Sequence, residues 1–315
     1  MSCEIEHIVS LAVVIPVYNA EKYLSNALDS VLNEGIEELQ IYLVDDGSID
    51  ESLFICRKYA EKHPDITVIS QANAGPSAAR NVALAIVREK YVTFLDADDE
   101  IEPGTLQKNL EWLQTHPDVD ALFYPLQSVH FDRNITQMVS YTETSILSKE
   151  DAWEKWCKGD KSLPGFFGGK IYARKLFDGL KIPEYLRFAE DMYLLSDLLA
   201  RASKICLSPY GNYRYYEREN AATQTPWTES KASNIGEAYF HRWEVARKLR
   251  ISKASVVNAW RLALAEIVAE RRSFPRILSK QLNILKHERP SFRQCLSAGI
   301  SIRQLFGIFR NLLAR

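Results

Sequence analysis

The chain lacks any long hydrophobic run, and no segment approaches the ~20 consecutive apolar residues of a membrane-spanning helix. Its start, Met1–His7, is acidic and has no basic stretch ahead of an apolar one, so we expect no signal peptide. Its five cysteines lie far apart without a C-x-x-C pair, which argues against a zinc ribbon or a redox pair. Reduced thiols are typical of the cytoplasm, and we expect the protein there.

Several common nucleotide-binding and hydrolase motifs are missing as well. No G-x-G-x-x-G follows the first predicted strand, which leaves a dinucleotide dehydrogenase unsupported. The segment Pro164–Ile171 is nearest to a Walker A loop, but it lacks the first glycine and the Ser or Thr after Lys170. No H-E-x-x-H or G-x-S-x-G occurs. Any phosphate must therefore be bound mainly by a metal ion and by scattered donors.

The composition is that of a soluble globular protein of about two domains, with 315 residues, 46% hydrophobic and 25% charged. The net charge of −2 hides an asymmetry. Residues 271–315 contain ten Lys or Arg and one acid, which leaves −11 for residues 1–270. Apolar residues recur at helical spacing from Ile300 to Leu313, as in an amphipathic helix that lies on an anionic membrane or packs on its own domain. The acidic body argues against nucleic acid as a partner.

The first third of the chain alternates between strand and helix patterns. Apolar runs bounded by polar turns predict buried strands at residues 11–17, 40–44, 66–69 and 91–95. Apolar residues at helical spacing predict helices at residues 21–33, 51–63, 75–89 and 103–116. This alternation predicts an α/β fold with a doubly wound, parallel sheet, in which ligands bind beyond the carboxyl ends of the strands. The last hundred residues are mostly helical in pattern.

Polar residues follow each of the four predicted strands. They are Tyr18-Asn19, Asp45-Asp46-Gly47-Ser48, Asn73-Ala74-Gly75 and the acidic loop Asp96–Asp99. The acidic loop puts three carboxylates in four positions, and such close acids raise one another's pKa unless a cation relieves the repulsion. Oxygen-only ligands favour Mg²⁺ or Mn²⁺, and Mg²⁺ commonly shares its coordination with substrate phosphates. The sequence thus predicts a metal–diphosphate site, and the alternative is a polar loop that caps the next helix.

These motifs resemble, in order and in spacing, those of family 2 of the inverting nucleotide-sugar glycosyltransferases, which have the GT-A fold. The resemblance covers about residues 10–216. It rests on Pro16-Val17-Tyr18-Asn19, Asp45–Asp50, Asn73-Ala74-Gly75, Ala79-Arg80-Asn81, Phe94–Asp99, Gly169-Lys170-Ile171-Tyr172, Glu190–Tyr193 and Tyr213-Arg214-Tyr215. It implies a nucleotide-sugar-binding and catalytic domain at 1–216, with a Rossmann-like, mostly parallel sheet flanked by helices. Residues 217–315 carry no motif of this family; from their helical pattern we expect a helical C-terminal region that contacts the acceptor, the membrane or the second subunit of a homodimer.

The resemblance also implies roles for single residues. Asp98 is expected to bind Mn²⁺ or Mg²⁺ directly, and Asp96 to lie at the ribose and the water shell of the metal. The uridine pocket matches Pro16, Tyr18 and Asp46, whose carboxylate can accept the imide N–H of uracil. The residues expected to bind the UDP-sugar are Pro16, Tyr18, Asp46, Asn73, Arg80, Asp96 and Lys170.

For Arg80, Lys170 and Asp99 alternatives remain. Arg80 contacts the donor or the acidic loop, unless it is a surface arginine. Lys170 contacts the diphosphate or the acceptor. Asp99 is a further ligand or the cap of the next helix.

An inverting transfer needs a base that takes the acceptor's proton. By resemblance the base is Asp191, with Glu190 orienting it or binding acceptor hydroxyls; the alternative is two helix-start acids without catalytic function. Processive synthases of this kind carry Q-x-x-R-W, whereas here Tyr239 stands where glutamine would precede Arg242-Trp243. We therefore expect one sugar per encounter. Five aromatic residues are either acceptor platforms or core: Trp153, Trp156, Phe166, Phe167 and Trp227.

We therefore expect a bacterial-type, metal-dependent, inverting glycosyltransferase that moves a hexose or N-acetylhexosamine from a UDP-sugar. The acceptor would be a glycan or lipid-linked glycan, a precursor of lipopolysaccharide, capsule or exopolysaccharide. The enzyme would be cytoplasmic, with or without peripheral contact to the inner face of the cell membrane. One alternative is a sugar nucleotidyltransferase, which usually has a Gly- and Arg-rich loop where this chain has Tyr18–Lys22. The other is an inactive UDP-sugar-binding scaffold.

Overall fold

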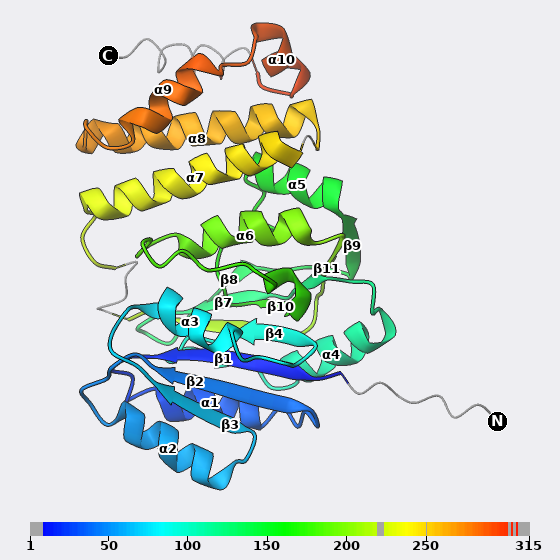
Figure 1. Cartoon of the computed structure of the whole chain (residues 1–315). Helices are drawn as coiled ribbons and strands as arrows, with labels where there is room; N and C mark the ends of the chain where they lie inside the picture. The colour runs from blue at the N-terminus through cyan, green and yellow to red at the C-terminus, as the bar shows by residue number, and fades with distance from the viewer. Residues whose placement is uncertain (1–8, 219–223, 250, 302–303, 305–306, 308–315) are drawn as a thin grey trace, which may run out of the picture. The chain divides into compact units, whose positions relative to one another are not determined.

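The computed structural model describes residues 9–218, 224–249, 251–301, 304 and 307 (Figure 1). The chain forms two compact units. The first consists of residues 1–146, 166–184 and 202–221, and the second of residues 147–165, 185–201 and 222–315. Each unit is therefore discontinuous in sequence.

The first unit is built on a large sheet with the strand order β3-β2-β1-β4-β10-β6-β11-β9. Its strands are β1 (Leu11–Val17), β2 (Leu39–Asp45), β3 (Ile66–Ser70), β4 (Tyr91–Phe94), β6 (Ala121–Phe123), β9 (Ser145–Ser148), β10 (Lys170–Ala173) and β11 (Lys204–Leu207). β1 to β4 pair in parallel, as expected, and β10 runs antiparallel to both β4 and β6. The predicted α/β class with a mostly parallel sheet is confirmed.

The register of the parallel strands brings their carboxyl ends to one edge. Val17 of β1 lies opposite Asp45 of β2, and Asp45 lies opposite Ser70 of β3. Leu95, directly after β4, donates its N–H to Val14 O of β1 at 3.1 Å. The polar segments that follow these strands therefore leave the sheet at the same edge.

The helices of the first unit pack on this sheet (Figure 1). They are α1 (Leu24–Leu32), α2 (Ser52–Lys62), α3 (Pro76–Leu84) and α4 (Thr105–Thr115), with a short 3₁₀ helix at Arg174–Phe177. α3 packs against β1 and β2, and it ends at Leu84 rather than at Glu89 as the sequence predicted. The apolar residues of α1 and α4 form one core with those of β1 and β2.

A second, smaller sheet in the first unit was not predicted. Its order is β5 (Glu100–Ile101), β12 (Tyr213–Tyr216), β7 (Leu126–Val129) and β8 (Ile135–Val139). β12 pairs antiparallel with β5, which follows the acidic loop directly. This pairing brings residues more than a hundred positions apart to the candidate site.

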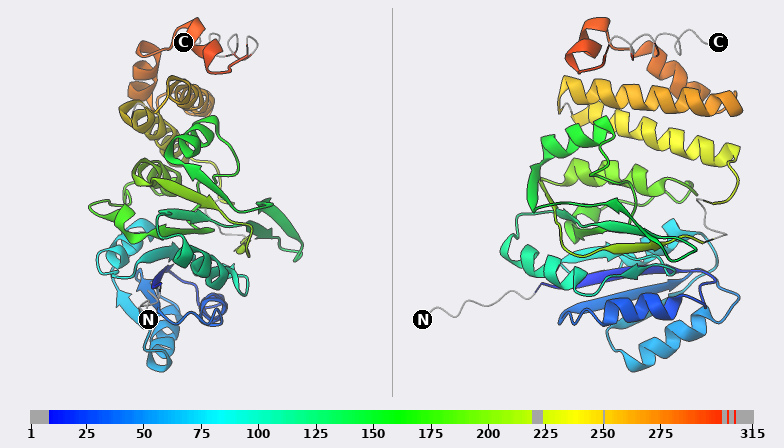
Figure 2. Two further views of the ribbon diagram at one scale, coloured as in Figure 1. Left: turned by 90° about the vertical axis from the view of Figure 1, so that its right-hand side faces the viewer. Right: turned by 180° about the vertical axis from the view of Figure 1, so that it is seen from behind.

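The second unit is helical, as the C-terminal sequence predicted. It contains α5 (Lys149–Lys158), α6 (Glu190–Arg201), α7 (Glu229–Leu249), α8 (Lys253–Ser273), α9 (Ser279–His287) and α10 (Phe292–Ser297). α7 and α8 pack against each other, and the right-hand view of Figure 2 shows them side by side along their length.

The expected domain boundary at residue 216 differs from the division that the structure shows, because α5 and α6 pack with the C-terminal helices. Trp156 Nε1 of α5 donates to Ser196 Oγ of α6 at 3.1 Å. Arg242 Nη1 of α7 donates to Trp156 O at 3.1 Å, and His241 pairs with Asp197 at 3.0 Å.

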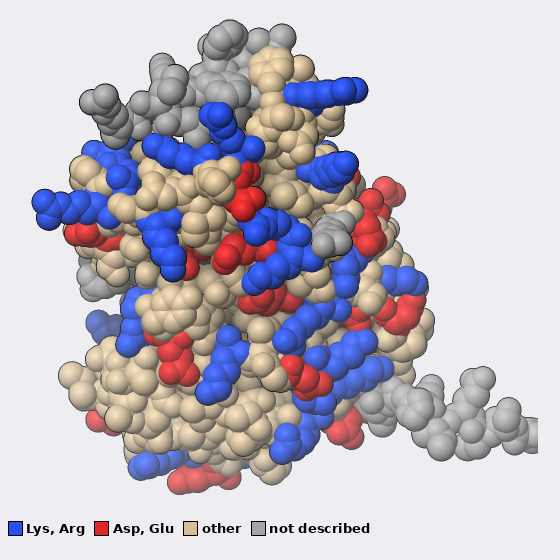
Figure 3. Space-filling model, turned by 45° about the horizontal axis from the view of Figure 1, so that its top comes forward, with Lys and Arg blue, Asp and Glu red and all other residues tan. Residues whose placement is uncertain are grey.

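Within the described residues, no helix is both long and apolar enough to cross a membrane. Most of the amphipathic tail expected from Ile300 to Leu313 lies outside the described residues, although Ile300 itself is buried. Figure 3 shows Lys and Arg side chains mixed with Asp and Glu side chains over the face that it displays.

Candidate active site

The acidic loop holds two half-exposed carboxylates and one buried carboxylate. The side chains of Asp96 and Asp98 are 43% and 40% exposed. Asp99 is buried, and its Oδ2 accepts a hydrogen bond from Tyr213 Oη at 2.6 Å. Its Oδ1 accepts from Tyr216 N at 2.9 Å. Asp96 and Asp98 are thus open to a ligand, whereas Asp99 fastens the loop to β12.

The interpretation of Asp99 as the cap of the next helix is wrong. α4 begins at Thr105, and its N-cap residue is Gly104. The N-terminal amides of α4 are instead bound by the buried carboxylate of Glu34. This carboxylate accepts from the backbone N–H groups of Gly104, Leu106 and Gln107 at 2.8, 2.7 and 3.0 Å. Burial raises the pKa of Glu34, and these hydrogen bonds oppose that shift.

Arg80 orients Asp96. Its Nη2 lies 2.7 Å from Asp96 Oδ1, and its guanidinium lies 4.3 Å from the centroid of the Phe167 ring. The Arg80 side chain is 5% exposed, because α3 approaches the sheet closely through buried alanines such as Ala79 and Ala83. Of the contacts considered for Arg80, the structure shows the one with the acidic loop.

Arg218 is a second cation at the acidic loop, and the sequence did not indicate it. Its Nη2 donates to the backbone oxygen of Asp98 at 2.7 Å, and its Nε lies 3.9 Å from Asp98 Oδ2. The guanidinium stacks over the rings of Tyr23 and Tyr216, at 3.8 and 4.9 Å. Arg214, the arginine of the motif Tyr213-Arg214-Tyr215, is instead paired with Glu102 at 2.8 Å.

A polar cavity of about 350 Å³ adjoins Arg218. Its lining includes three cations, Lys22, Arg133 and Arg218, two acids, Glu100 and Glu217, and His130, which pairs with Glu217 at 2.9 Å.

The electrostatics of the acidic loop favour a bound cation. Burial and the neighbouring Asp96 raise the pKa of Asp98 to about 6, with a partial offset from Arg218. Burial, Asp96 and Asp98 also raise the pKa of Asp99. A divalent ion would reverse these shifts, because it stabilises the charged carboxylates.

The acidic loop offers two open carboxylates as ligands for a metal ion. Among the residues that the structure describes, no group of three or more Asp, Glu, His or Cys side chains could hold a metal ion. Asp96 and Asp98 supply two carboxylates. That suits Mg²⁺ or Mn²⁺, because Mg²⁺ takes one or two protein carboxylates and completes its shell with water and substrate phosphates.

Lys170 does not line this site. Its side chain is fully buried, and its Nζ donates to the backbone oxygens of Phe166 and Gly168. A Cβ at Gly168 would lie 2.5 Å from the Tyr213 ring, so only glycine lets Tyr213 reach the acidic loop. The hydroxyl of Tyr213 also accepts from Asp96 N at 3.2 Å. Lys170 therefore supports the acidic loop indirectly: it binds the backbone of Gly168, which packs against Tyr213, and Tyr213 bonds to the loop.

Asp46, which the resemblance assigned to the uridine pocket, joins two loops. Its Oδ1 accepts from Gln71 Nε2 and Ala74 N at 2.6 and 2.9 Å, and its Oδ2 accepts from Gly75 N at 2.7 Å. Gly47 has φ = +75°, and a Cβ there would meet Asn73 N at 2.9 Å. The turn after β2 and the segment 71–75 after β3 are thus fixed to each other.

Residues after β1 and β3 contribute exposed groups to the same edge. Tyr18, after β1, is 52% exposed, and Asn73, after β3, is exposed as well. Pro16 lies half-buried near the end of β1. Asn19 has φ = +49°, a conformation that asparagine tolerates, and its Oδ1 accepts from Ile49 N at 2.9 Å. The structure therefore brings the residues expected for the uridine pocket to one rim of the sheet.

The expected catalytic acids lie in the second unit. Glu190 and Asp191 form the first turn of α6, where the helix N-terminus stabilises negative charge. Asp191 Oδ1 accepts from Met192 N at 2.7 Å. Ala189, directly before them, has φ = +60°, which is unusual for a residue other than glycine.

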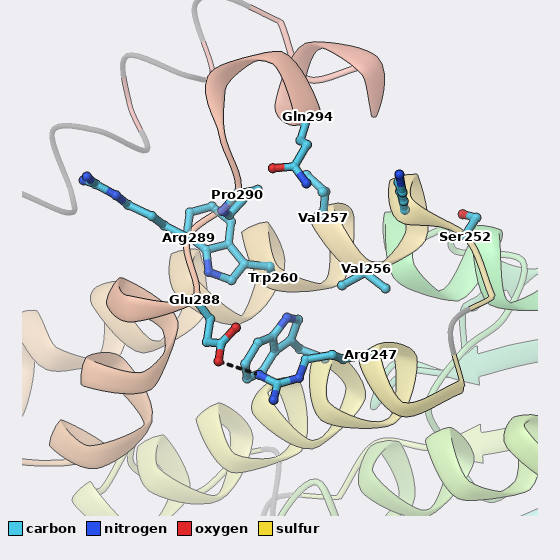
Figure 4. Close-up of a pocket in the computed structure, with 11 residues that line it drawn as sticks. Arg247, Ser252, Val256, Val257, Trp260, Glu288, Arg289, Pro290 and Gln294 are labelled. Carbon is cyan, nitrogen blue, oxygen red and sulfur yellow. Dashed lines mark ion pairs between the residues drawn. The ribbon is translucent and has the colours of Figure 1, made fainter.

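The second unit has a cavity of its own, about 460 Å³ in volume, and neither of these acids lines it (Figure 4). It lies among α7, α8 and the segment that precedes α10. Trp243 and Trp260 line it, and Arg247 and Glu288 form an ion pair of 3.1 Å at its edge.

Comparison with known proteins identifies the family. The model of glycosyl transferase family 2 matches residues 12–170.

Three relatives are similar to this chain over most of its length. EpsJ of Bacillus subtilis (strain 168), described as an uncharacterized glycosyltransferase, is 28% identical over 73% of this chain and 67% of its own length. The poly(ribitol-phosphate) beta-N-acetylglucosaminyltransferase TarS of Staphylococcus aureus (strain Mu50) is 25% identical over 90% of this chain and 48% of its own length. The minor teichoic acid biosynthesis protein GgaB of B. subtilis is 28% identical over 67% of this chain and 23% of its own length. The chain thus spans about half of TarS and a quarter of GgaB.

Solved structures agree with this family. The crystal structure of S. aureus TarS 1-349 in complex with UDP-GlcNAc matches 95% of this chain and 92% of that chain, with a TM-score of 0.65 at 20% identity. The complex of the same protein with UDP gives a TM-score of 0.66. At this identity the match shows the fold, which is GT-A. The chain therefore belongs to glycosyl transferase family 2 and is a glycosyltransferase.

Proposed function

We propose that the chain moves a hexose or N-acetylhexosamine from a UDP-sugar to a hydroxyl of a cell-surface glycan precursor, with inversion and with Mn²⁺ or Mg²⁺. The acidic loop carries this proposal, because Asp96 and Asp98 are open at the rim of the sheet and repel each other without a cation. Two relatives support it. TarS is named for N-acetylglucosaminyl transfer and has been solved with UDP-GlcNAc, and GgaB is named for teichoic acid biosynthesis.

On the donor side, Asp98 and Asp96 would hold the cation, and Arg80 keeps Asp96 in place. A divalent cation bound there would neutralise the diphosphate as it leaves the sugar. Pro16 and Tyr18 would pack on the uracil ring, with Asn73 beside them. The carboxylate of Asp46 already accepts three hydrogen bonds from the segment 71–75, and a carboxylate has capacity for about four, which leaves one for the imide N–H. Lys170 is left out of this donor site because it is buried.

On the acceptor side, Asp191 would take the proton from the acceptor hydroxyl while that oxygen attacks the anomeric carbon. The bond to the diphosphate breaks as the new bond forms, so an α-linked donor gives a β-linked product. Glu190 would bind acceptor hydroxyls. Membership of family 2 favours this reaction over nucleotidyl transfer.

A panel of UDP- and GDP-sugars with Mn²⁺, scored by thermal shift and by hydrolysis, tests the donor site. The right donor stabilises the protein by RT ln(1 + [L]/Kd), which is about 2.7 kcal/mol at a hundredfold excess over Kd. Asp98→Asn is expected to abolish the Mn²⁺-dependent part of this shift. Asp118→Asn, a matched change of an exposed aspartate in the same unit, is expected to keep it. Stabilisation by UDP that is equal in wild type and Asp98→Asn would refute the metal site.

Asp191→Asn separates catalysis from donor binding. We expect turnover to fall by about 10²–10⁴-fold, because the general base is lost, while stabilisation by UDP and Mn²⁺ stays unchanged. Turnover that survives this change would mean that Asp191 is not the base.

A further inference from the structure

Three aromatic side chains gather around the start of α6 in the second unit, and the proposed donor site does not use them. We call them the aromatic patch: Tyr185, Phe188 and Trp227. Tyr185 is 65% exposed and Trp227 is 46% exposed. The rings of Phe188 and Trp227 meet nearly at right angles, 5.6 Å apart between centroids. A contiguous group of exposed aromatic rings often marks a surface that binds a ligand.

Hydrogen bonds and a cation hold these rings in place although they face solvent. Trp227 Nε1 donates to Glu270 Oε2 of α8 at 2.7 Å, which fixes the orientation of the indole. Lys231 lies over the Phe188 ring at 5.5 Å, and its Nζ also donates to Thr225 O at 2.8 Å. A surface that is ordered before a ligand arrives loses less entropy on binding.

The other side of the aromatic patch is fastened to α6. Tyr185 hydrogen-bonds to Tyr193, and the Tyr193 ring stacks on His241 of α7 at 3.6 Å. Asn234 of α7 accepts from the backbone N–H of Arg187 at 3.1 Å. The segment 185–189 is thereby held against α6 and α7, directly before Glu190 and Asp191.

The structure also separates the aromatic residues that the sequence left undecided. Trp153, Trp156 and Phe167 are buried, with at most 6% exposed, and they belong to the core. Phe166 is exposed but lies in the first unit. Of the five residues, Trp227 is the one in the second unit with an open ring surface.

We propose that the aromatic patch binds a pyranose ring of the acceptor, so that the acceptor ends in a pyranoside rather than in an alditol phosphate. This inference rests on the proposed function. A pyranose has a face of C–H groups that packs on an indole or phenol ring, whereas an open-chain alditol has no such face. Glu190 and Asp191 follow Phe188 by two and three residues, in the first turn of α6. On this point the chain differs from TarS, which is named for transfer to poly(ribitol phosphate).

Saturation-transfer NMR on the full chain without donor tests the patch directly. The probes are the methyl β-pyranosides of glucose, galactose and N-acetylglucosamine, with ribitol phosphate as the open-chain comparison, each at about 10 mM to detect millimolar affinity. We expect saturation on the ring C–H groups of at least one pyranoside and none on ribitol phosphate. Trp227→Ala is expected to abolish the signal, and Trp227→Phe to retain part of it. Phe292→Ala, which removes an aromatic ring that is 50% exposed on α10, is the matched control and should leave the signal unchanged.

Three results would overturn the proposal: no signal from any pyranoside with wild type, equal signals from ribitol phosphate, or a Trp227→Ala signal equal to wild type. If Trp227→Ala does not fold by circular dichroism, Tyr185→Ala and Trp227→Phe decide in its place. Stabilisation by UDP and Mn²⁺ is measured on the same samples. Its loss in wild type, with pyranoside binding intact, would count against the donor site and not against the aromatic patch.

Discussion

At the scale of single residues, the acidic loop is a place where negative charge is unfavourable until a cation binds. The pKa of Asp98 is raised to about 6, mainly by burial and by Asp96. A carboxyl with a raised pKa binds more protons in the folded state than in the unfolded state, so its contribution to stability declines as pH rises from about 4 to about 6. Asp98 therefore destabilises the metal-free protein at neutral pH.

Thermal unfolding in EDTA at several pH values measures this effect. Asp98→Asn is expected to melt about 2 °C above wild type at pH 7, and the difference should shrink as the pH falls and vanish below about pH 4, where Asp98 is protonated in both the folded and the unfolded protein. The size corresponds to about 1 kcal/mol, because the half-exposed carboxylate is partly screened by solvent. With UDP and Mn²⁺ added, the order should reverse. A difference that does not change with pH would show that Asp98 titrates normally.

Ala189 gives a second prediction at this scale. Its left-handed backbone conformation costs an L-residue about 1–2 kcal/mol, whereas glycine adopts it freely. Ala189→Gly should therefore unfold at an equal or higher urea concentration and keep its activity. Ala189→Val should be destabilised, because a β-branched side chain tolerates this conformation least. If both variants unfold like wild type, the backbone there is not left-handed in solution.

Single-residue roles could be predicted where a motif carried them. The acidic loop followed from the carboxylates after the fourth predicted strand, and its contact with Arg80 was one of the alternatives that the sequence left open. Arg218 and Glu34 did not, because each reaches its partner across a long stretch of chain: Arg218 lies 120 positions from Asp98, and Glu34 lies 70 positions from Gly104. A lone arginine or glutamate has no local pattern that marks such a contact.

At the scale of helices and strands, hydrophobic periodicity predicted the first sheet well. β1 was predicted with its observed bounds, and the next three strands within one residue at either end. The smaller sheet escaped prediction because its strands are short, with β5 only two residues long. Its pairings are set by contacts between distant segments, which a local pattern does not encode.

Glu34 gives the prediction for an element. Glu34→Ala would leave three amides at the start of α4 without their acceptor, and we expect a loss of about 2–3 kcal/mol in the free energy of unfolding. Urea denaturation measures it. Glu37→Ala, which removes an exposed glutamate nearby, is the control and should cost less than about 0.5 kcal/mol. Equal midpoints for the two variants would mean that α4 does not depend on this cap.

At the scale of the whole molecule, the second unit recruits two segments from the middle of the chain. The resemblance to family 2 implied a boundary near residue 216, because the family motifs end there. The packing of the helices gives a different division, in which α5 and α6 belong to the second unit. The Arg242 guanidinium of α7 stacks on Trp156 of α5 at 3.6 Å, and burial lowers the pKa of Arg242 to about 10. Thus α6, which carries the family motif Glu190–Tyr193, packs with helices that carry none.

A prediction about truncation follows from this packing. A chain that ends at residue 216 would expose the buried faces of α5 and α6, and we expect it to aggregate or to bind the dye ANS. A chain that ends at residue 301 keeps every helix from α5 to α10 and should unfold cooperatively like the full chain. Light scattering and ANS fluorescence distinguish the two. A well-folded, monomeric 1–216 fragment would contradict the division into these units.

One feature behind the acidic loop affects how loss-of-function mutations will be interpreted. Lys170 holds the backbone of Phe166 and Gly168, and the missing side chain of Gly168 admits Tyr213, whose hydroxyl bonds to the loop at Asp96 and Asp99. Replacing Gly168 by alanine would displace the tyrosine and so disturb carboxylates that position 168 never touches. A genetic screen for lost activity would group such an allele with the aspartate mutants. Only a structure would show that its defect is a displaced tyrosine and not a missing carboxylate.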